Sequence, residues 1–273
     1  MEECDEWACI EDDLIARRGE LAWQDVVPHQ DRVVELRVAA IARPGSNTLI
    51  LTLTPRTPAD ALCQFMPGQY LQLLPPEGDW LERAYSIGNA PRDDGSVEIQ
   101  VRRVADGRFS AWLFERLSEG DVVRGRGPLG EFTLRSAPGT PLVFVAGGTG
   151  LAPLKAMIEQ QLALDPTRAM RLFWGVGSRD DLYELDILAG WQERDPHLRC
   201  TVAVEHGPLP EGLTSGVHSV TGRLAEAIAV DAPVLAGSDA YIAGPPVMMP
   251  SVVAALAQSG VDRERIRVDS FGL

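Results

Sequence analysis

Two patterns of apolar and polar residues divide the chain near residue 136. Before that point, short apolar stretches bounded by Gly and Pro predict β-strands. The strand candidates are residues 33–42, 47–55, 69–75, 83–89, 96–104, 121–127 and 131–135. One helix is predicted among them, over residues 110–117 (SAWLFERL). Many short strands at this spacing are typical of an antiparallel barrel or sandwich.

After the linker-like segment SAPGTP (136–141), strands and helices alternate. The predicted strands cover residues 142–148, 171–177, 198–205, 240–244 and 265–271. The predicted helices lie between them, over residues 152–164, 181–192, 222–230 and 246–260, the last interrupted by Pro250. This alternation predicts an α/β domain with a doubly wound parallel sheet and helices on both of its faces.

Length and charge narrow the range of functions. A chain of 273 residues is long enough for two domains, and no apolar run approaches the ~18 residues that a membrane-spanning helix needs. The acidic start MEECDEWACI is unlike a secretory signal, so we expect a cytoplasmic protein with no membrane partner. The net charge of -14 disfavours nucleic acid as a partner.

Acidic residues are concentrated at the start of the chain. Residues 1–30 contain nine acidic residues and two arginines, whereas residues 83–135 contain nine arginines and eight acidic residues. We therefore predict an acidic N-terminal extension over residues 1–30, a β-barrel domain over residues 31–136 and an α/β domain over residues 137–273.

The cysteines and histidines do not form a metal-binding pattern. Cys4 and Cys9 have the C-x4-C spacing that opens one kind of iron–sulfur motif, but Asp12 stands where its next cysteine is required. Cys63 and Cys200 are isolated in the sequence, as are the four histidines, His29, His197, His206 and His218. The sequence thus predicts no metal site. It also lacks a G-x-S-x-G elbow and a P-loop.

The motif GGTGLAP (147–153) lies between a predicted buried strand and a predicted helix. Gly147, Gly148, Thr149 and Gly150 form a turn whose backbone can approach a diphosphate, and the helix that follows offers free N–H groups. Pro153 suits the first helical turn, where its missing N–H costs nothing. The alternative is a tight structural turn, because the spacing is not that of the common dinucleotide fingerprint.

A second motif, RAYS (83–86), lies in the first half of the chain. Arg83 can fork onto a phosphate, Tyr85 can stack on a cofactor ring, and Ser86 can reach a ring nitrogen. A flat strand directs Arg83 and Tyr85 to one face and Ser86 to the other, so a ligand must follow the strand edge or a bend. The alternative is an ordinary half-exposed strand.

Two further motifs lie at predicted helix starts. GRFS (107–110) precedes the short helix, where Ser110 is expected to be the N-cap of an anion site or of a plain capped helix. YIAGPP (241–246) ends a predicted parallel strand, so Gly244 and Pro245 are expected at the edge where such sheets bind ligands. The alternative is a helix-start turn with Met248 and Met249 in the core. A Gly/Pro turn, GPLGEF, covers residues 127–132.

Taken together and in this order, these motifs resemble those of the ferredoxin–NADP reductase-like flavoproteins. The similarity runs from residue 33 to residue 273 and is greatest to the reductase components of bacterial aromatic-ring oxygenases. It implies an antiparallel FAD-binding β-barrel followed by a doubly wound α/β domain that binds a nicotinamide nucleotide. Such reductases often carry a fused iron–sulfur ferredoxin domain, for which we find no ligands, so a separate ferredoxin is the expected electron acceptor.

The resemblance also assigns roles to individual residues. Tyr85 and Ser86 are implied to act at the reacting end of the flavin. The remaining implied contacts are Arg83, Gly107, Phe109 and Ser110 with FAD; Gly147, Gly148, Thr149, Gly150 and Pro153 with the nucleotide diphosphate; Gly244 and Pro245 with the nicotinamide; and Phe271 over the flavin. Ala243 departs from the family pattern, because many members have Cys there.

The expected activity is electron transfer from NADH through FAD to the separate ferredoxin, in the service of an oxygenase. Arg179 favours NADPH, whereas Asp180 and Asp181 favour NADH, and on balance we expect NADH. The alternatives are a free-flavin or quinone reductase and a non-catalytic nucleotide-binding subunit of a redox complex. Neither the oligomeric state nor the role of Cys4 and Cys9 follows from the sequence.

Overall fold

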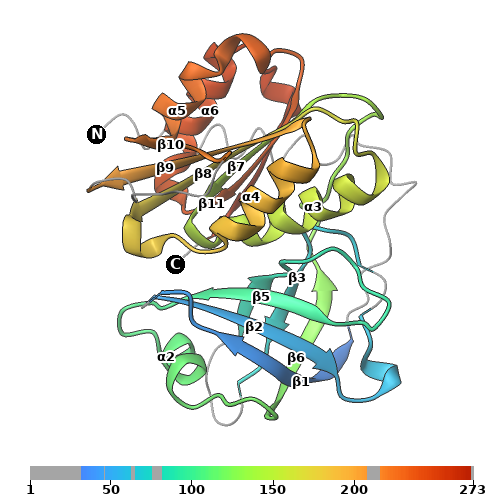
Figure 1. The fold of residues 1–273 in the computed structure, drawn as a ribbon. Helices are drawn as coiled ribbons and strands as arrows, with labels where there is room; N and C mark the ends of the chain where they lie inside the picture. The colour runs from blue at the N-terminus through green and yellow to red at the C-terminus, as the bar shows by residue number, and fades with distance from the viewer. Residues whose placement is uncertain (1–31, 46, 63–64, 76–81, 208–215, 272–273) are drawn as a thin grey trace.

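The structure, a computed structural model, describes residues 32–271 except 46, 63–64, 76–81 and 208–215. Within these residues the chain forms one antiparallel and one parallel sheet, each of six strands (Figure 1). The predicted fold class, an antiparallel barrel followed by a doubly wound α/β sheet, is confirmed. The predicted acidic extension lies outside the described residues.

The antiparallel sheet closes on itself as a barrel. Its strands are β1 (Val33–Ala42), β2 (Thr48–Pro55), β3 (Tyr70–Leu73), β4 (Arg83–Ser86), β5 (Val97–Arg102) and β6 (Val122–Leu129), in the order β4-β3-β6-β1-β2-β5. The edge strands β4 and β5 meet through a bridge between Ile87, the residue after β4, and Ile99 of β5. Alternate residues of β2, Leu49, Leu51 and Leu53, are fully buried, as the two-residue period of a strand requires.

One predicted barrel strand, residues 131–135, is absent from the structure, and this prediction was wrong. The amide of Thr133 donates to the Glu131 carbonyl, which forms a tight turn. The amide of Arg135 donates instead to the Tyr241 hydroxyl at 2.8 Å. The segment therefore leaves the barrel and runs to the parallel sheet.

The parallel sheet contains β7 (Leu142–Gly147), β8 (Met170–Ser178), β9 (Leu198–His206), β10 (His218–Thr221), β11 (Asp239–Gly244) and β12 (Ile266–Ser270). Its order is β10-β9-β8-β7-β11-β12. The chain adds strands on one side of β7 and then crosses to the other side, so the direction of winding switches between β7 and β11. Ligands of such sheets bind at the carboxyl ends of the strands at this switch point.

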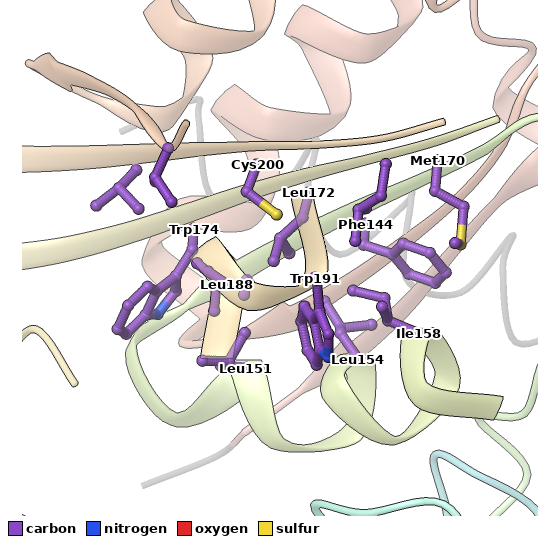
Figure 2. Close-up of a cluster of buried hydrophobic side chains, with 14 of the residues drawn as sticks. Phe144, Leu151, Leu154, Ile158, Met170, Leu172, Trp174, Leu188, Trp191 and Cys200 are labelled. Carbon is purple, nitrogen blue, oxygen red and sulfur yellow. The ribbon is translucent and has the colours of Figure 1, made fainter. Parts of the chain in front are cut away.

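Helices cover both faces of the parallel sheet (Figure 1). Helices α3 (Leu151–Leu164) and α4 (Leu185–Arg194) lie on the face nearer the barrel, and α5 (Leu224–Val230) and α6 (Met249–Gln258) lie on the other. Figure 2 shows the first face, where Trp174 from β8 and Trp191 from α4 pack with aliphatic side chains. Burial in this cluster raises the pKa of the Cys200 thiol to about 12.

Two predictions for this half need correction. The strand β10 was not predicted, because it has only four residues and its exposed edge position leaves it without an apolar pattern. The helix predicted over residues 246–260 begins at Met249 after a 3-10 turn (Pro246–Met248), so Pro250 lies in its first turn and does not interrupt it. No helix in the described residues has the length and apolar character needed to cross a bilayer.

Candidate functional site

The motifs RAYS and GRFS lie next to each other in the barrel. The ring of Tyr85 on β4 lies 6.2 Å, centroid to centroid, from the ring of Phe109 on α2 (Arg108–Glu115). Burial raises the pKa of the Tyr85 hydroxyl above its usual range, so the hydroxyl stays neutral. Arg83 is exposed and Ser86 is half-buried. This strand therefore offers a cation, an aromatic face and a hydroxyl within one short stretch.

A pocket of about 430 Å³ lies between the end of β5 and the start of α2. Its lining includes Gly107 and three arginines, Arg102, Arg103 and Arg108. Positive side chains at a helix start are suited to an anionic diphosphate. Sequence reasoning did not single out Arg102; the only signal was the surplus of arginine in this half of the chain.

The start of α2 differs from the prediction. Gly107, not Ser110, is the N-cap, so the predicted N-cap was wrong. The Ser110 side chain is buried and turned back, accepting from the Val104 amide at 3.1 Å and donating to the Gly107 carbonyl at 3.0 Å. A Cβ on Gly107 would lie 2.8 Å from the Ser110 oxygen, so this turn requires glycine. Ser110 thus shapes the turn that lines the pocket.

The GGTG turn lies at the carboxyl end of β7, as predicted. Gly148–Gly150 form a 3-10 turn that continues directly into α3, and Pro153 lies in the first turn of that helix. A Cβ on Gly150 would lie 2.0 Å from the carbonyl oxygen of Ala243, so the turn packs directly against the backbone of β11. Only glycine permits this approach.

The turn after β11 meets the GGTG turn. A Cβ on Gly244 would lie 3.0 Å from the Gly147 Cα, and a Cβ on Gly147 would lie 2.9 Å from Pro245 Cδ. The Phe271 amide donates to the Gly244 carbonyl at 3.0 Å, which holds the end of the chain's last described strand at the same place. The structure thus brings Gly147, Gly244, Pro245 and Phe271 together at the switch point of the sheet.

The barrel and the parallel sheet approach each other at these turns. A Cβ on Gly148 would lie 4.0 Å from the Arg102 guanidinium, so one arginine lies beside both the GGTG turn and the barrel pocket. The Gly148 carbonyl faces inward and accepts from the Trp174 indole N–H at 2.9 Å. A second contact joins Gly45, in the β1–β2 turn, to the backbone of Asp180.

Among the described residues, no group of three or more His, Cys, Asp or Glu side chains is arranged to hold a metal ion. Of the four cysteines, Cys4, Cys9 and Cys63 lie outside the described residues.

Known proteins share both halves of this arrangement. Residues 35–134 match the oxidoreductase FAD-binding domain family and residues 144–254 match the oxidoreductase NAD-binding domain family. The chain is 31% identical to the ferredoxin--NAD(P)(+) reductase component of the Pseudomonas putida naphthalene 1,2-dioxygenase system. The match covers 90% of this chain and 71% of that protein. The chain belongs to the ferredoxin–NADP reductase-like flavoproteins.

Two further comparisons agree with this family. The reductase subunit of an Amycolatopsis aromatic O-demethylase is 34% identical over 86% of this chain and 67% of that subunit. The crystal structure of the Amycolatopsis cytochrome P450 reductase GcoB superposes with a TM-score of 0.80 at 32% identity, covering 92% of this chain and 73% of that one. This flavoprotein is accordingly an FAD-dependent oxidoreductase that uses a nicotinamide nucleotide.

The residues present fit both cofactors of this reductase. The barrel pocket has arginines and a glycine turn for a diphosphate. The GGTG and Gly244 turns are so close that side chains at Gly147 or Gly150 would collide with the neighbouring turn. Glycine turns at the carboxyl edge of a parallel sheet, where no Cβ atoms intervene, allow the backbone to approach the diphosphate of a dinucleotide.

Proposed function

We propose that this protein passes electrons from NADH, through bound FAD, to an iron–sulfur protein that serves an oxygenase. The observation that carries the proposal is the position of Arg102, which lines the barrel pocket and lies beside Gly148 of the nucleotide turn. When bound, FAD would supply the redox chemistry, which is acceptance of a hydride from the reduced nicotinamide and return of two electrons, one at a time, with release of one proton.

In this proposal the chain's own residues bind and orient the two cofactors. Arg83, Gly107, Phe109 and Ser110 hold FAD, with Tyr85 and Ser86 at its reacting ring. Gly147, Gly148, Thr149, Gly150 and Pro153 form the nucleotide diphosphate site, Gly244 and Pro245 border the nicotinamide, and Phe271 covers the flavin. Their role is alignment, since holding two reactants in contact accounts for much of the barrier lowering in such transfers.

We infer a preference for NADH from the turn after β8. Asp181 caps this turn: its carboxylate accepts from the Ser178 amide at 3.0 Å and from the Ser178 hydroxyl at 2.9 Å. Arg179 and Asp180 are exposed beside it. An acidic side chain at this position favours a free ribose, whereas a lone arginine favours a 2′-phosphate. Steady-state kcat/KM with NADH and NADPH tests the preference, and equal values would refute it.

The electron acceptor is proposed from charge and from the relatives. The proteins named above are reductase components of oxygenase and demethylase systems. Exposed arginines surround α2, including Arg102, Arg103, Arg108 and Arg116, and such a face steers an acidic partner toward the flavin pocket. Residues 1–30 are acidic and can compete for this face. Deleting residues 1–25 should then change the salt dependence of ferredoxin reduction.

An anaerobic titration tests the proposal as a whole. The FAD-loaded protein is titrated with NADH while visible absorbance is recorded, and oxidised ferredoxin is then added. We expect bleaching of the flavin bands followed by their return, with two ferredoxins reduced per NADH. A protein that remains colourless with added FAD would refute the proposal. Turnover with free flavin or quinone and none with ferredoxin would identify the alternative reductase activity.

A further inference from the structure

A buried cluster of charged side chains joins the barrel to the α/β half of the molecule. Lys155 of α3 has only 2% of its side chain exposed. Its ammonium nitrogen lies 2.8 Å from both carboxylate oxygens of Glu98 on β5, 3.1 Å from Glu184 and 3.7 Å from Glu159. One ammonium therefore faces three carboxylates, and one of the three comes from the barrel.

Gln100, also on β5, completes the cluster. Its amide nitrogen donates to Glu98 at 3.0 Å and to Glu184 at 2.9 Å. Its amide oxygen accepts from the Tyr183 hydroxyl at 2.8 Å. Both amide hydrogens and the amide oxygen are used, so the orientation of Gln100 is fixed by Glu98 on its own strand and by Glu184 and Tyr183 on the other side of the boundary.

The cluster lies directly behind the nucleotide turn. Helix α3 follows Gly150 without a break, and Lys155 lies about one turn into it. The Tyr183 hydroxyl is 3.4 Å from the Gly148 carbonyl oxygen, next to the Trp174 indole that donates to the same oxygen. A shift of Gln100 in the cluster can therefore be transmitted to the GGTG turn through the Tyr183 side chain alone.

The same cluster also holds the flavin-binding side. Glu159, one turn beyond Lys155, accepts from the Ala90 amide at 3.0 Å, and Ala90 follows closely after the RAYS motif. The Gly88 amide donates to the Glu98 carbonyl at 2.8 Å. Both proposed cofactor sites are therefore joined to residues around Lys155, through the side chain of Glu159 and the backbone of Glu98 on one side and through Tyr183 on the other.

We propose that Glu184 and Gln100 are positioning residues for hydride transfer. They hold the nucleotide turn, residues 147–150, against β5, and the strength of this contact depends on whether Glu184 carries a proton. The proposal rests on the proposed function, because it concerns the alignment of the same two cofactor sites. Neither residue is proposed to touch a reacting atom.

The charge balance of the cluster explains why one carboxyl holds a proton. Three ionised carboxylates around one ammonium would leave two net negative charges in a nearly water-free place, which is costly. Burial, and then the charge of Glu98, raises the pKa of Glu184 to about 7 against the opposing effect of Lys155. The carboxylates of Glu184 and Glu98 outweigh burial and hold the pKa of Lys155 above its ordinary value, so it stays charged.

Loss of that proton changes the contact between the two halves. Ionised Glu184 repels Glu98 across the boundary. The neutral carboxyl removes this repulsion, still accepts from Gln100 through its carbonyl oxygen, and leaves Lys155 paired with Glu98. The charged and titratable groups facing Glu184 are Glu98 of β5, Lys155 of α3 and the adjacent Tyr183, while Glu159 of α3 faces Lys155. The cluster should thus hold the cofactor sites together more firmly at low pH than at high pH.

Stopped-flow reduction of the FAD-loaded protein by NADH, under anaerobic conditions, tests this proposal. Hydride transfer carries no separate proton, so a pH dependence reports on the protein. For the wild type we expect the limiting rate constant to fall about fivefold as pH rises through about 7, with the NADH dissociation constant nearly unchanged. Glu184→Gln should keep the low-pH rate across the range.

Two more variants separate positioning from simple structural support. Tyr183→Phe should lower the rate at every pH and keep the wild-type midpoint, because it removes the bond to Gln100 without removing the titrating group. Glu35→Gln, in a surface pair with Arg56 on the barrel, is the matched control and should follow the wild type.

Specific results would overturn the proposal. A Glu184→Gln profile with the wild-type midpoint, or a Tyr183→Phe rate equal to that of the wild type, would each refute it. If Glu184→Gln does not fold, Tyr183→Phe alone decides. A wild-type protein whose FAD is not reduced by NADH at any pH refutes the proposed function instead, so the two failures are distinguishable.

Discussion

The ionisation of Glu184 should make the stability of the protein depend on pH. The folded state raises the pKa of this carboxyl from its ordinary value of 4.5 to about 7. A group whose pKa is raised on folding binds its proton more tightly in the folded state. Its contribution to stability is therefore complete below about 4.5 and is lost as pH rises through about 7.

The size of the effect follows from the shift. Each pKa unit corresponds to about 1.4 kcal/mol, so the full contribution is about 3 kcal/mol. Between about pH 5.5 and about pH 8.5 the expected loss is about 2 kcal/mol. Little discount for solvent screening is needed, because only 7% of the Glu184 side chain is exposed.

Urea unfolding of wild type and Glu184→Gln at these two pH values measures the difference. Tryptophan fluorescence follows the transition, because Trp174 and Trp191 are buried in the α/β half and Trp112 lies on α2 of the barrel half. The free energy of unfolding of Glu184→Gln, relative to the wild type, should increase by about 2 kcal/mol from the lower to the higher pH. In Glu35→Gln the same difference should change by less than about 1 kcal/mol. Parallel pH dependences of the wild type and Glu184→Gln would show that this reasoning is incorrect.

Three further substitutions probe the site. Gly150→Ala places a Cβ 2.0 Å from the Ala243 carbonyl oxygen, so NADH binding measured by flavin reduction should be lost or the protein should be insoluble; near-normal reduction would contradict the packing of the two turns. Arg83→Ala should weaken FAD binding about tenfold or more in an equilibrium titration, since it removes a charge-assisted contact, and an unchanged dissociation constant would exclude Arg83 from the flavin site. Lys155→Met leaves Glu98 and Glu184 buried without a cation and should lower the free energy of unfolding by about 3–5 kcal/mol, in contrast to a change below about 1 kcal/mol if the ion pairs contribute little.

Most of the fold could be predicted because its elements are bounded by local signals. Gly and Pro mark the ends of the barrel strands, and the change from strands to alternating strands and helices marks the second sheet. The segment 131–135 misled because its alternating pattern matches a strand, yet its amides bond to its own turn and to Tyr241. Local pattern cannot report which partner a strand-like segment finds.

The glycine turns at the ends of β7 and β11 could be located from the sequence, but the residues that join them to the barrel could not. Gly147 and Gly244 are conspicuous in the sequence because glycine-rich turns follow apolar strands. Lys155 carries no such signal: it stands in a helix that is buried without a break from Leu151 to Ile158, and its partner Glu98 lies 57 residues away. Ser110 was placed at the helix start because serine is a common N-cap, whereas here Gly107 takes that place and Ser110 supports the turn.

The closure of the barrel has a consequence for its internal motions. A single bridge, Ile87 to Ile99, joins strands β4 and β5, whereas six residue pairs join β2 and β5. A seam this narrow opens readily in local fluctuations. Ser86 lies directly before the seam, so a molecule bound along β4 should hold the two edge strands together there. The Gly88 amide, which donates across the seam to the Glu98 carbonyl at 2.8 Å, should therefore exchange with solvent far more slowly in the flavin-loaded barrel than in the empty one, and under the proposed function the cofactor becomes part of what keeps the barrel closed.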